Sequence, residues 1–149
     1  MMWSGEVVEL SRAEFGSGEY AACLELRRVV LREPLGLEWS EEDLAMEEEE
    51  WQMGWWEEGE VLACVSVRWL RAGRVKLRQM AVRGDRQGKG LGRLLVGAVL
   101  EILGGEGVAE VELHAREPVV GFYEKLGFEV VGERFEEVGL GHWAMKHQI

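Results

Sequence analysis

The sequence has 149 residues, of which 47% are hydrophobic, and it carries a formal net charge of −11. This length suits one compact domain over residues 1–149, and the acidic balance argues against nucleic acid or anionic membranes as partners, because both recruit a surplus of Lys and Arg. No apolar run approaches the ~20 residues of a membrane-spanning helix. Cys23 and Cys64 lie in apolar segments, which favours buried thiols over a disulfide or a metal site. Without a secretory-signal pattern at the N-terminus, we expect a cytoplasmic protein.

The N-terminal third is predicted to form one strand and two helices. A strand is expected at residues 6–10, followed by a helix over about 17–32 that Pro34 stops. Ser40, followed by Asp43 three positions later, is a capping signature for a second short helix to residue 46. The acidic run 47–50 comes next. We interpret it as a solvated connection, with a site for a cationic substrate amine as the alternative.

Two strands are predicted to follow as a hairpin. Residues 51–57 form the first strand, Glu58-Gly59 the turn, and residues 61–70 the second strand. The second strand is apolar on both faces, so we expect it to be central and covered by helices above and below. The apolar segment 51–56, together with the C-terminal strands, could also support a homodimer.

The next strand, over residues 75–82, is predicted to contain an irregularity. Val75 and Leu77 point to one face, and the apolar register returns at Met80 and Val82, one residue out of step. Side chains alternate between faces with a period of two, so this slip predicts a β-bulge near residues 78–79. A bulge interrupts the ladder of hydrogen bonds and leaves backbone groups free to bind a ligand.

A glycine-rich turn joins this strand to a long amphipathic helix. The turn reads Gln87-Gly-Lys-Gly-Leu-Gly92, and the apolar residues from Leu91 to Leu103 recur at spacings of three and four. The first turn of a helix has unpaired N–H groups, and glycines let an anion approach them closely. Lys89 and Arg93 add positive charge. A phosphate site is therefore predicted here, but the dinucleotide and Walker A patterns both fail, which disfavours a nucleotide-binding regulator.

The C-terminal part is predicted to add a strand, a helix and two more strands. The strand covers residues 109–115, the helix runs from Pro118 to Gly127, and the final strands cover 128–136 and 142–146. Strands and helices that alternate around the central segment predict a mixed α/β sheet flanked by helices. Parallel neighbours in that sheet would be joined by a helical crossover.

Two sequence blocks resemble the GCN5-related N-acetyltransferase (GNAT) superfamily, including small bacterial members of it. The first block is the Gln-x-x-Gly-x-Gly loop that starts at Gln87, and the second is Phe-Tyr-Glu-Lys-Leu-Gly-Phe at 122–128. They occur in the order and at the separation that the family shows. The resemblance covers residues 60–147 well and the N-terminal third loosely. It implies a central sheet splayed open at an acetyl-CoA site and an acetyl-CoA-dependent N-acetyltransferase activity toward a primary amine of a small molecule or peptide.

The resemblance also implies roles for individual residues. The strand backbone of Met80, Ala81 and Val82 would line the pantetheine arm of acetyl-CoA, where N–H groups at the bulge could polarise the thioester carbonyl. The pyrophosphate would be held by loop N–H groups, those of Gln87, Gly88, Lys89, Gly90, Gly92 and Arg93. Tyr123 matches the family's general acid, with a core aromatic as the alternative. No metal is implied.

The general base is the least determined part of the site. Many relatives carry a glutamate on the bulged strand, but this chain has Arg78 and Gln79 there. His142 is the best remaining candidate because imidazole titrates near neutral pH, and His114 and Glu137 are weaker ones. Each histidine could instead make a structural hydrogen bond. Without a base, the protein could be a non-catalytic acyl-CoA sensor or interaction module of the same fold.

Overall fold

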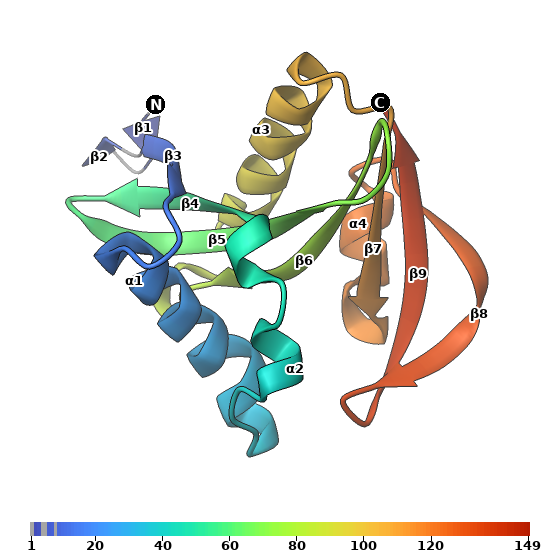
Figure 1. The fold of residues 1–149 in the computed structure, drawn as a ribbon, viewed down its shortest axis with the longest axis horizontal. Coiled ribbons are helices and arrows are strands. Elements are labelled where there is room, and N and C mark those ends of the chain that lie inside the picture. Colours follow the sequence, from blue (N-terminus) through green and yellow to red (C-terminus); the bar gives the residue numbers. More distant parts are fainter. Residues whose placement is uncertain (1, 4–5, 8) are drawn as a thin grey trace.

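The computed structural model describes residues 2–3, 6–7 and 9–149. In this part of the chain, seven strands form one mixed sheet with helices on both faces (Figure 1). The strands of this sheet are β3 (Glu9–Ala13), β4 (Trp51–Glu57), β5 (Glu60–Trp69), β6 (Arg74–Val82), β7 (Glu110–Arg116), β8 (Glu129–Glu137) and β9 (Leu140–Gln148). The helices are α1 (Gly18–Arg27), α2 (Glu41–Leu44), α3 (Leu91–Gly105) and α4 (Val120–Glu124).

The strands follow the order β3-β4-β5-β6-β7-β9-β8 across the sheet. The pair β6–β7 is parallel and α3 connects its two strands, whereas the other neighbours are antiparallel. A parallel pair needs such a crossover, because a tight turn can join only antiparallel strands. The predicted mixed α/β fold is therefore confirmed.

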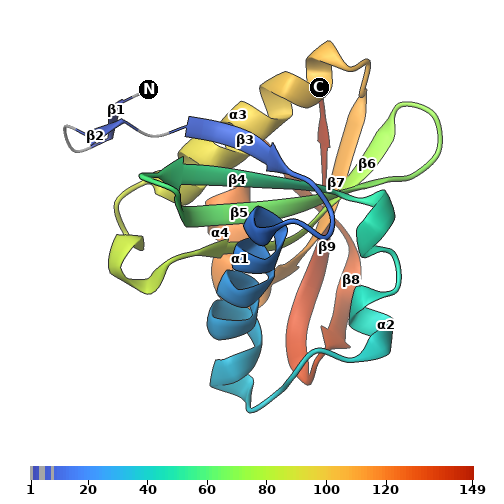
Figure 2. The same cartoon turned by 60° about the vertical axis from the view of Figure 1, so that its left-hand side comes forward.

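The central strand is buried on both faces, as predicted. Residues 61–67 of β5 are all buried. Helix α1 covers one face of β5 and α3 covers the other (Figure 2). Cys23 and Cys64 are free, buried thiols, and the Cys64 Sγ lies 3.7 Å from the Cys23 carbonyl oxygen. The strand 51–57, considered above as part of a dimer surface, lies inside the sheet between β3 and β5.

The N-terminal third differs from its prediction in detail. The strand expected at residues 6–10 includes residue 8, which lies outside the described residues. The short strands β1 (Met2–Trp3) and β2 (Glu6–Val7) pair with each other. Strand β3 extends to Ala13 and pairs with β4. The helix expected over 17–32 begins as α1 and changes to π-helical hydrogen bonding at Arg28–Arg32. The predicted capping box of α2 is confirmed, since Ser40 and Asp43 bond each other's backbone N–H. No helix in the described part of the chain is long and apolar enough to cross a membrane.

Candidate active site

The sheet opens in its middle, between β6 and β7. Their parallel pairing joins Arg74–Leu77 to Glu110–Leu113 and ends there, although β6 continues to Val82 and β7 to Arg116. Beyond this point the two strands diverge (Figure 1). Backbone groups along the facing edges of 78–82 and 114–116 are therefore available to a ligand. The splay that the sequence predicted is present.

The predicted β-bulge lies at the start of this opening. Ser66 of β5 pairs with Arg78 and Cys64 pairs with Ala81, so Gln79 and Met80 together oppose the single residue between them on β5. Gln79 has a φ of 52°, in the left-handed region that non-glycine residues rarely adopt. Such a conformation persists only when the surrounding structure holds it.

A buried ion pair holds the bulge from the α1 side. The Arg27 guanidinium donates to the side-chain oxygen of Gln79, through Nε at 2.8 Å and also through Nη2. Arg27 binds both oxygens of Glu47, at 2.8 and 3.0 Å, and both side chains are almost completely buried. Burial alone would raise the pKa of Glu47, but the hydrogen bonds and charge of Arg27 bring it below its ordinary value.

The acidic run 47–50 is therefore not simply the solvated connection that the sequence suggested. Glu48 and Glu49 are exposed, but Glu47 and Glu50 are buried. The Glu50 carboxylate accepts hydrogen bonds from Arg68 and Arg78 at 2.6 Å each. Two of the four glutamates thus neutralise arginines on the α1 face of the sheet, so neither of these two carboxylates is left for an incoming amine.

The glycine-rich loop has the geometry of an anion site. Gly90 is the N-cap of α3, with a φ of 81° and no side-chain cap. Among the described residues, the backbone N–H groups of Leu91, Gly92 and Arg93 have no acceptor, as expected for the first turn of a helix. Neither Lys89 nor Arg93 forms an ion pair within that part of the chain, so their positive charge is not neutralised there.

Two further contacts fix the loop relative to β6 and α4. The Gln87 side chain donates from Nε2 to the Val82 carbonyl at 2.9 Å, which ties the start of the loop to the end of the strand. A Cβ on Gly92 would lie 3.4–3.6 Å from Val82, Phe122 and Met80. The first turn of α3 therefore packs closely against the bulged strand and α4, and Gln87 and Gly92 of the loop lie beside Val82 of the strand.

Tyr123 lies in α4, on the opposite face of the sheet from α1. Its ring packs edge-on against Phe122 and Phe128, with centroids at 5.0 and 5.7 Å. Burial raises the pKa of Tyr123 to about 12. The hydroxyl has no hydrogen-bond partner among the described residues. The hydroxyl therefore stays protonated at neutral pH, and the ring is also part of the buried core.

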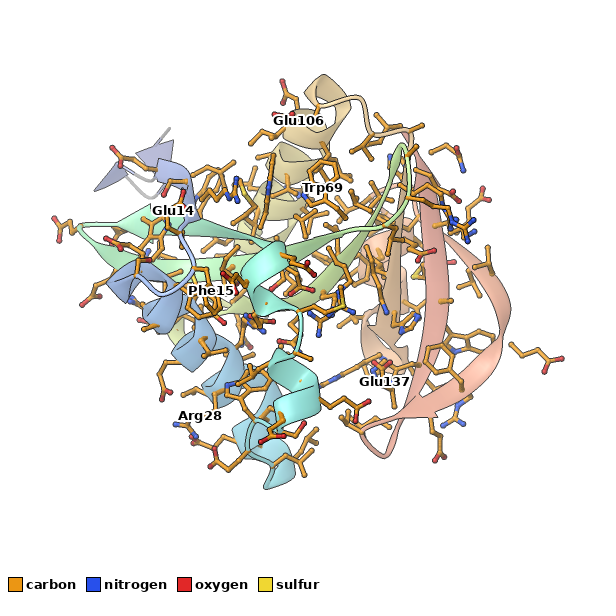
Figure 3. The ribbon with its side chains drawn as sticks, viewed as in Figure 1. Glu14, Phe15, Arg28, Trp69, Glu106 and Glu137 are labelled. Carbon is orange, nitrogen blue, oxygen red and sulfur yellow. The ribbon has the colours of Figure 1, made fainter. Side chains whose placement is uncertain are left out.

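The three candidates for the base lie together on the α1 face. Glu137 accepts a hydrogen bond from His114 Nδ1 at 3.0 Å, and its other oxygen lies 3.7 Å from His142 Nε2. The hydrogen bond from His114 keeps the pKa of Glu137 below its usual value. Figure 3 labels Glu137 on the side of β9 that faces α2. The sequence offered these residues as alternatives, and the structure joins them in one cluster.

The hydrogen bonding of His142 leaves one nitrogen free to accept a proton. His142 is 3% exposed and stacks on Phe135, and its Nδ1 lies 2.9 Å from the Leu140 carbonyl oxygen. A carbonyl oxygen only accepts, so Nδ1 carries the hydrogen and Nε2 of the neutral ring bears the lone pair. The nearby Glu137 carboxylate would stabilise the charged ring after proton transfer.

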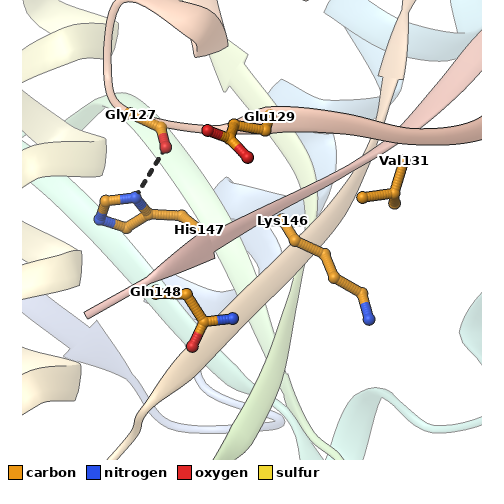
Figure 4. A pocket seen from close by; sticks show the side chains of 6 residues that line it. All are labelled: Gly127, Glu129, Val131, Lys146, His147 and Gln148. Atoms are coloured by element: carbon orange, nitrogen blue, oxygen red, sulfur yellow. Dashed lines mark hydrogen bonds between the residues drawn. The ribbon is translucent and has the colours of Figure 1, made fainter.

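A separate hollow lies at the other end of β8 and β9. It has a volume of about 380 Å³ and is lined by Gly127, Glu129, Val131, Lys146, His147 and Gln148. Figure 4 shows His147 within it, with its Nδ1 bonded to the Gly127 carbonyl oxygen. None of the predicted site residues lines this hollow, so we assign it no part in the chemistry.

Comparisons with known proteins agree with this geometry. The uncharacterised protein YyaT of Bacillus subtilis is 31% identical over 74 residues, which are 50% of this chain and 50% of that protein. The chain thus spans about half the length of this curated relative. In fold, it resembles the crystal structure of a candidate N-acetyltransferase from Lactobacillus plantarum, with a TM-score of 0.85, 20% identity and coverage of 95% and 97% of the two chains.

A second solved structure resembles the chain and contains the cofactor that the sequence implied. It is a GNAT family acetyltransferase from Elizabethkingia anophelis with acetyl-CoA bound, at a TM-score of 0.73 and 12% identity, with 95% and 98% of the two chains covered. The family model "Acetyltransferase (GNAT) family" matches residues 19–128, which include the bulge, the loop and Tyr123. With that match over most of its length and with this fold, the chain belongs to the acetyltransferase (GNAT) family.

Proposed function

We propose that this protein transfers the acetyl group of acetyl-CoA to a primary amine of a small molecule or peptide, in the cytoplasm. The observation that carries the proposal is that the strand bulge and the uncapped, glycine-rich start of α3 meet at the opening between β6 and β7. The close approach is seen at Gly92, where an added Cβ would lie 3.4 Å from Val82 and 3.6 Å from Met80. A long ligand with a phosphate-bearing end and a reactive thioester end suits this arrangement.

The residues that would hold acetyl-CoA fall into two groups. The loop would bind its pyrophosphate through N–H groups, from Gln87, Gly88, Lys89, Gly90, Gly92 and Arg93. The backbone of Met80, Ala81 and Val82 would run along the pantetheine arm, because β6 has no β7 partner at these residues. When bound, acetyl-CoA supplies a thioester carbonyl, whose carbon is open to attack by an amine.

Side chains on the two faces of the sheet would move the protons. His142 Nε2 accepts a proton from the acceptor amine as its nitrogen bonds to the acetyl carbon, and Glu137 stabilises the charged imidazole. The Tyr123 hydroxyl donates its proton to the sulfur as the carbon–sulfur bond breaks. A pKa of about 12 keeps Tyr123 protonated throughout the neutral range, as a general acid requires. N–H groups at the bulge stabilise the carbonyl oxygen.

Substitutions at Gly90 test the loop, because they separate backbone strain from charge. Gly90 has a φ of 81°, so any side chain is strained, but asparagine tolerates this region better than most residues. We expect Gly90→Asn to weaken CoA binding moderately and Gly90→Asp, which has almost the same shape but a negative charge, to abolish it. Calorimetric titration with CoA measures both.

A second substitution serves as the control. Gly97→Asp places the same charge on the exposed surface of α3, where a Cβ meets nothing within 4 Å, and it should leave CoA affinity unchanged. Equal affinities in folded Gly90→Asn and Gly90→Asp would remove the loop from the CoA site. Tight CoA binding without acetyl transfer would favour the alternative function, a non-catalytic acyl-CoA sensor.

A further inference from the structure

One arginine beside the candidate base lacks the anionic partner that its neighbours have. On the α1 face, Arg27 pairs with Glu47, and Arg68 and Arg78 pair with Glu50. Arg116 is partly buried at the end of β7, yet no carboxylate in the described part of the chain lies within ion-pair distance of it. Its Nη2 donates to the Leu31 carbonyl at 3.0 Å, and within the described part of the chain this neutral oxygen is its one hydrogen-bond acceptor.

Arg32, which follows Leu31 in the chain, is a second cation, and its charge is only weakly compensated by a carboxylate. The Arg32 side chain is 9% exposed, and its closest carboxylate oxygen, on Asp43, is 3.5 Å away. The other oxygen of Asp43 is already engaged in the capping box of α2. The Arg32 guanidinium also lies over the face of Trp39, 4.9 Å from the ring centroid. Partly desolvated cations of this kind favour an anion beside them.

The electrostatics of Arg116 agree with this geometry. Desolvation, and then the charge of Arg32, lower the pKa of Arg116, whereas the charge of Glu137 opposes them. The guanidinium groups of Arg116 and Arg32 therefore carry more N–H donors than the acceptors around them, the Leu31 carbonyl and Asp43, can pair with. Arg116 thus lacks a carboxylate partner among the described residues, and the charge of nearby Arg32 is compensated only by the 3.5 Å contact with Asp43.

The register of the sheet places this cationic pair beside the candidate base. Arg116 of β7 and His142 of β9 are directly paired across the two strands. Directly paired residues have Cα atoms about 4.5–5.5 Å apart and side chains on the same face. The Arg116 and His142 side chains are therefore neighbours on the α1 face of the sheet.

We propose that the acceptor amine carries an oxyanion, a carboxylate or a phosphate, and that Arg116, supported by Arg32, binds this group while His142 faces the amine. The inference rests on the proposed acetyl transfer and narrows its substrate to anionic amines such as amino acids or aminoalkyl phosphates. Arg116 is then a residue that determines specificity. Neutral amines and polyamines are poor acceptors, because they leave Arg116 without an anion.

Matched acceptor pairs test the proposal. Initial rates are measured for amino acids against their amides and for aminoethyl phosphate against ethanolamine, in wild type, Arg116→Gln, Arg116→Lys and Arg71→Gln. Arg71 is exposed in the turn between β5 and β6, so its variant removes one positive charge away from the site. The wild type should prefer one anionic class by about 10- to 100-fold in kcat/KM, the size of one charge-assisted hydrogen bond. The acceptor pair that shows the preference identifies the bound group as a carboxylate or a phosphate.

The preference should respond to Arg116 in a specific way. Arg116→Gln should raise KM for the anionic acceptor about 10- to 100-fold with little change in kcat, and it should leave the neutral partner unaffected. Arg116→Lys should retain part of the preference, and Arg71→Gln all of it. The preference is the ratio of kcat/KM for two acceptors, measured in the same protein preparation. A smaller folded fraction of Arg116→Gln therefore does not change this ratio.

Two outcomes overturn the inference while leaving acetyl transfer in place. One is equal kcat/KM for the anionic and neutral members of each pair in the wild type. The other is an unchanged preference in Arg116→Gln. If no amine is acetylated, the proposed function fails. Ligand-observed NMR on the CoA-saturated protein then measures whether the site at Arg116 binds an anionic group. Binding of N-acetyl amino acids that equals binding of their amides would then reject it.

Discussion

The buried pair of Arg27 and Glu47 supports the bulge, so Glu47→Gln should damage both the fold and the site. Arg27 is completely buried, and the Glu47 side chain is its one carboxylate partner among the described residues. Glutamine keeps the shape of Glu47 but removes the charge. Breaking a buried ion pair on one side leaves an uncompensated charge and typically costs about 3–5 kcal/mol. For a chain of this size, 1 kcal/mol corresponds to roughly 2–4 °C in melting temperature.

The melting temperature of Glu47→Gln should therefore fall by about 6–20 °C. Glu48→Gln makes the same chemical change at an exposed neighbour and should alter stability by no more than about 0.5 kcal/mol. Thermal unfolding followed by circular dichroism compares the two. Equal melting temperatures would mean that the ion pair does not contribute to stability.

The same pair predicts a dependence on pH. The pKa of Glu47 is lower in the folded protein than its ordinary value, so its contribution is fully present above the unfolded pKa of about 4.3. It is lost as the pH falls through the lower folded value. The difference in stability between wild type and Glu47→Gln should thus be constant from pH 6 to 8 and shrink in acid. A difference that grows in acid would contradict the assignment.

Three further predictions concern the site itself. Tyr123→Phe should lower turnover roughly 10²- to 10⁴-fold with little change in CoA affinity, because the ring and its packing remain; equal turnover would assign Tyr123 to the core alone. His142→Ala should depress the rate more at pH 6–7 than at pH 9, where more of the amine is already neutral, and parallel pH profiles with a lower melting temperature would indicate a structural histidine. Gln87→Ala should weaken CoA binding by about 2- to 10-fold through loss of one hydrogen bond to Val82, whereas unchanged affinity in calorimetry would show that this tie does not order the loop.

Features encoded by neighbouring residues could be predicted from the sequence. The parity slip between Leu77 and Met80 located the bulge, because alternation along a strand is a local property. The glycines of the loop and the apolar spacing of α3 predicted the strand, turn and helix in their order. Pro118 was expected to start a helix and instead lies in a 3₁₀ turn just before α4.

The charged groups around the bulge could not be predicted in this way. Arg27 and Glu47 are 20 residues apart, and Arg116 and Leu31 are 85 apart. Nothing in a run of four glutamates distinguishes the two that are buried. Their environment is set by the packing of α1 against the sheet, which the local pattern does not encode.

Acetyl transfer by this protein can be tested by following the release of the CoA thiol in the presence of an amine. Purified protein is mixed with acetyl-CoA and each member of a panel of amines, and the acetylated product is identified by mass spectrometry. We predict that thiol release requires both an amine and the protein, that an acetylated amine is formed, and that both are lost in Gly90→Asp. CoA binding without amine-dependent thiol release for any acceptor in the panel would contradict it.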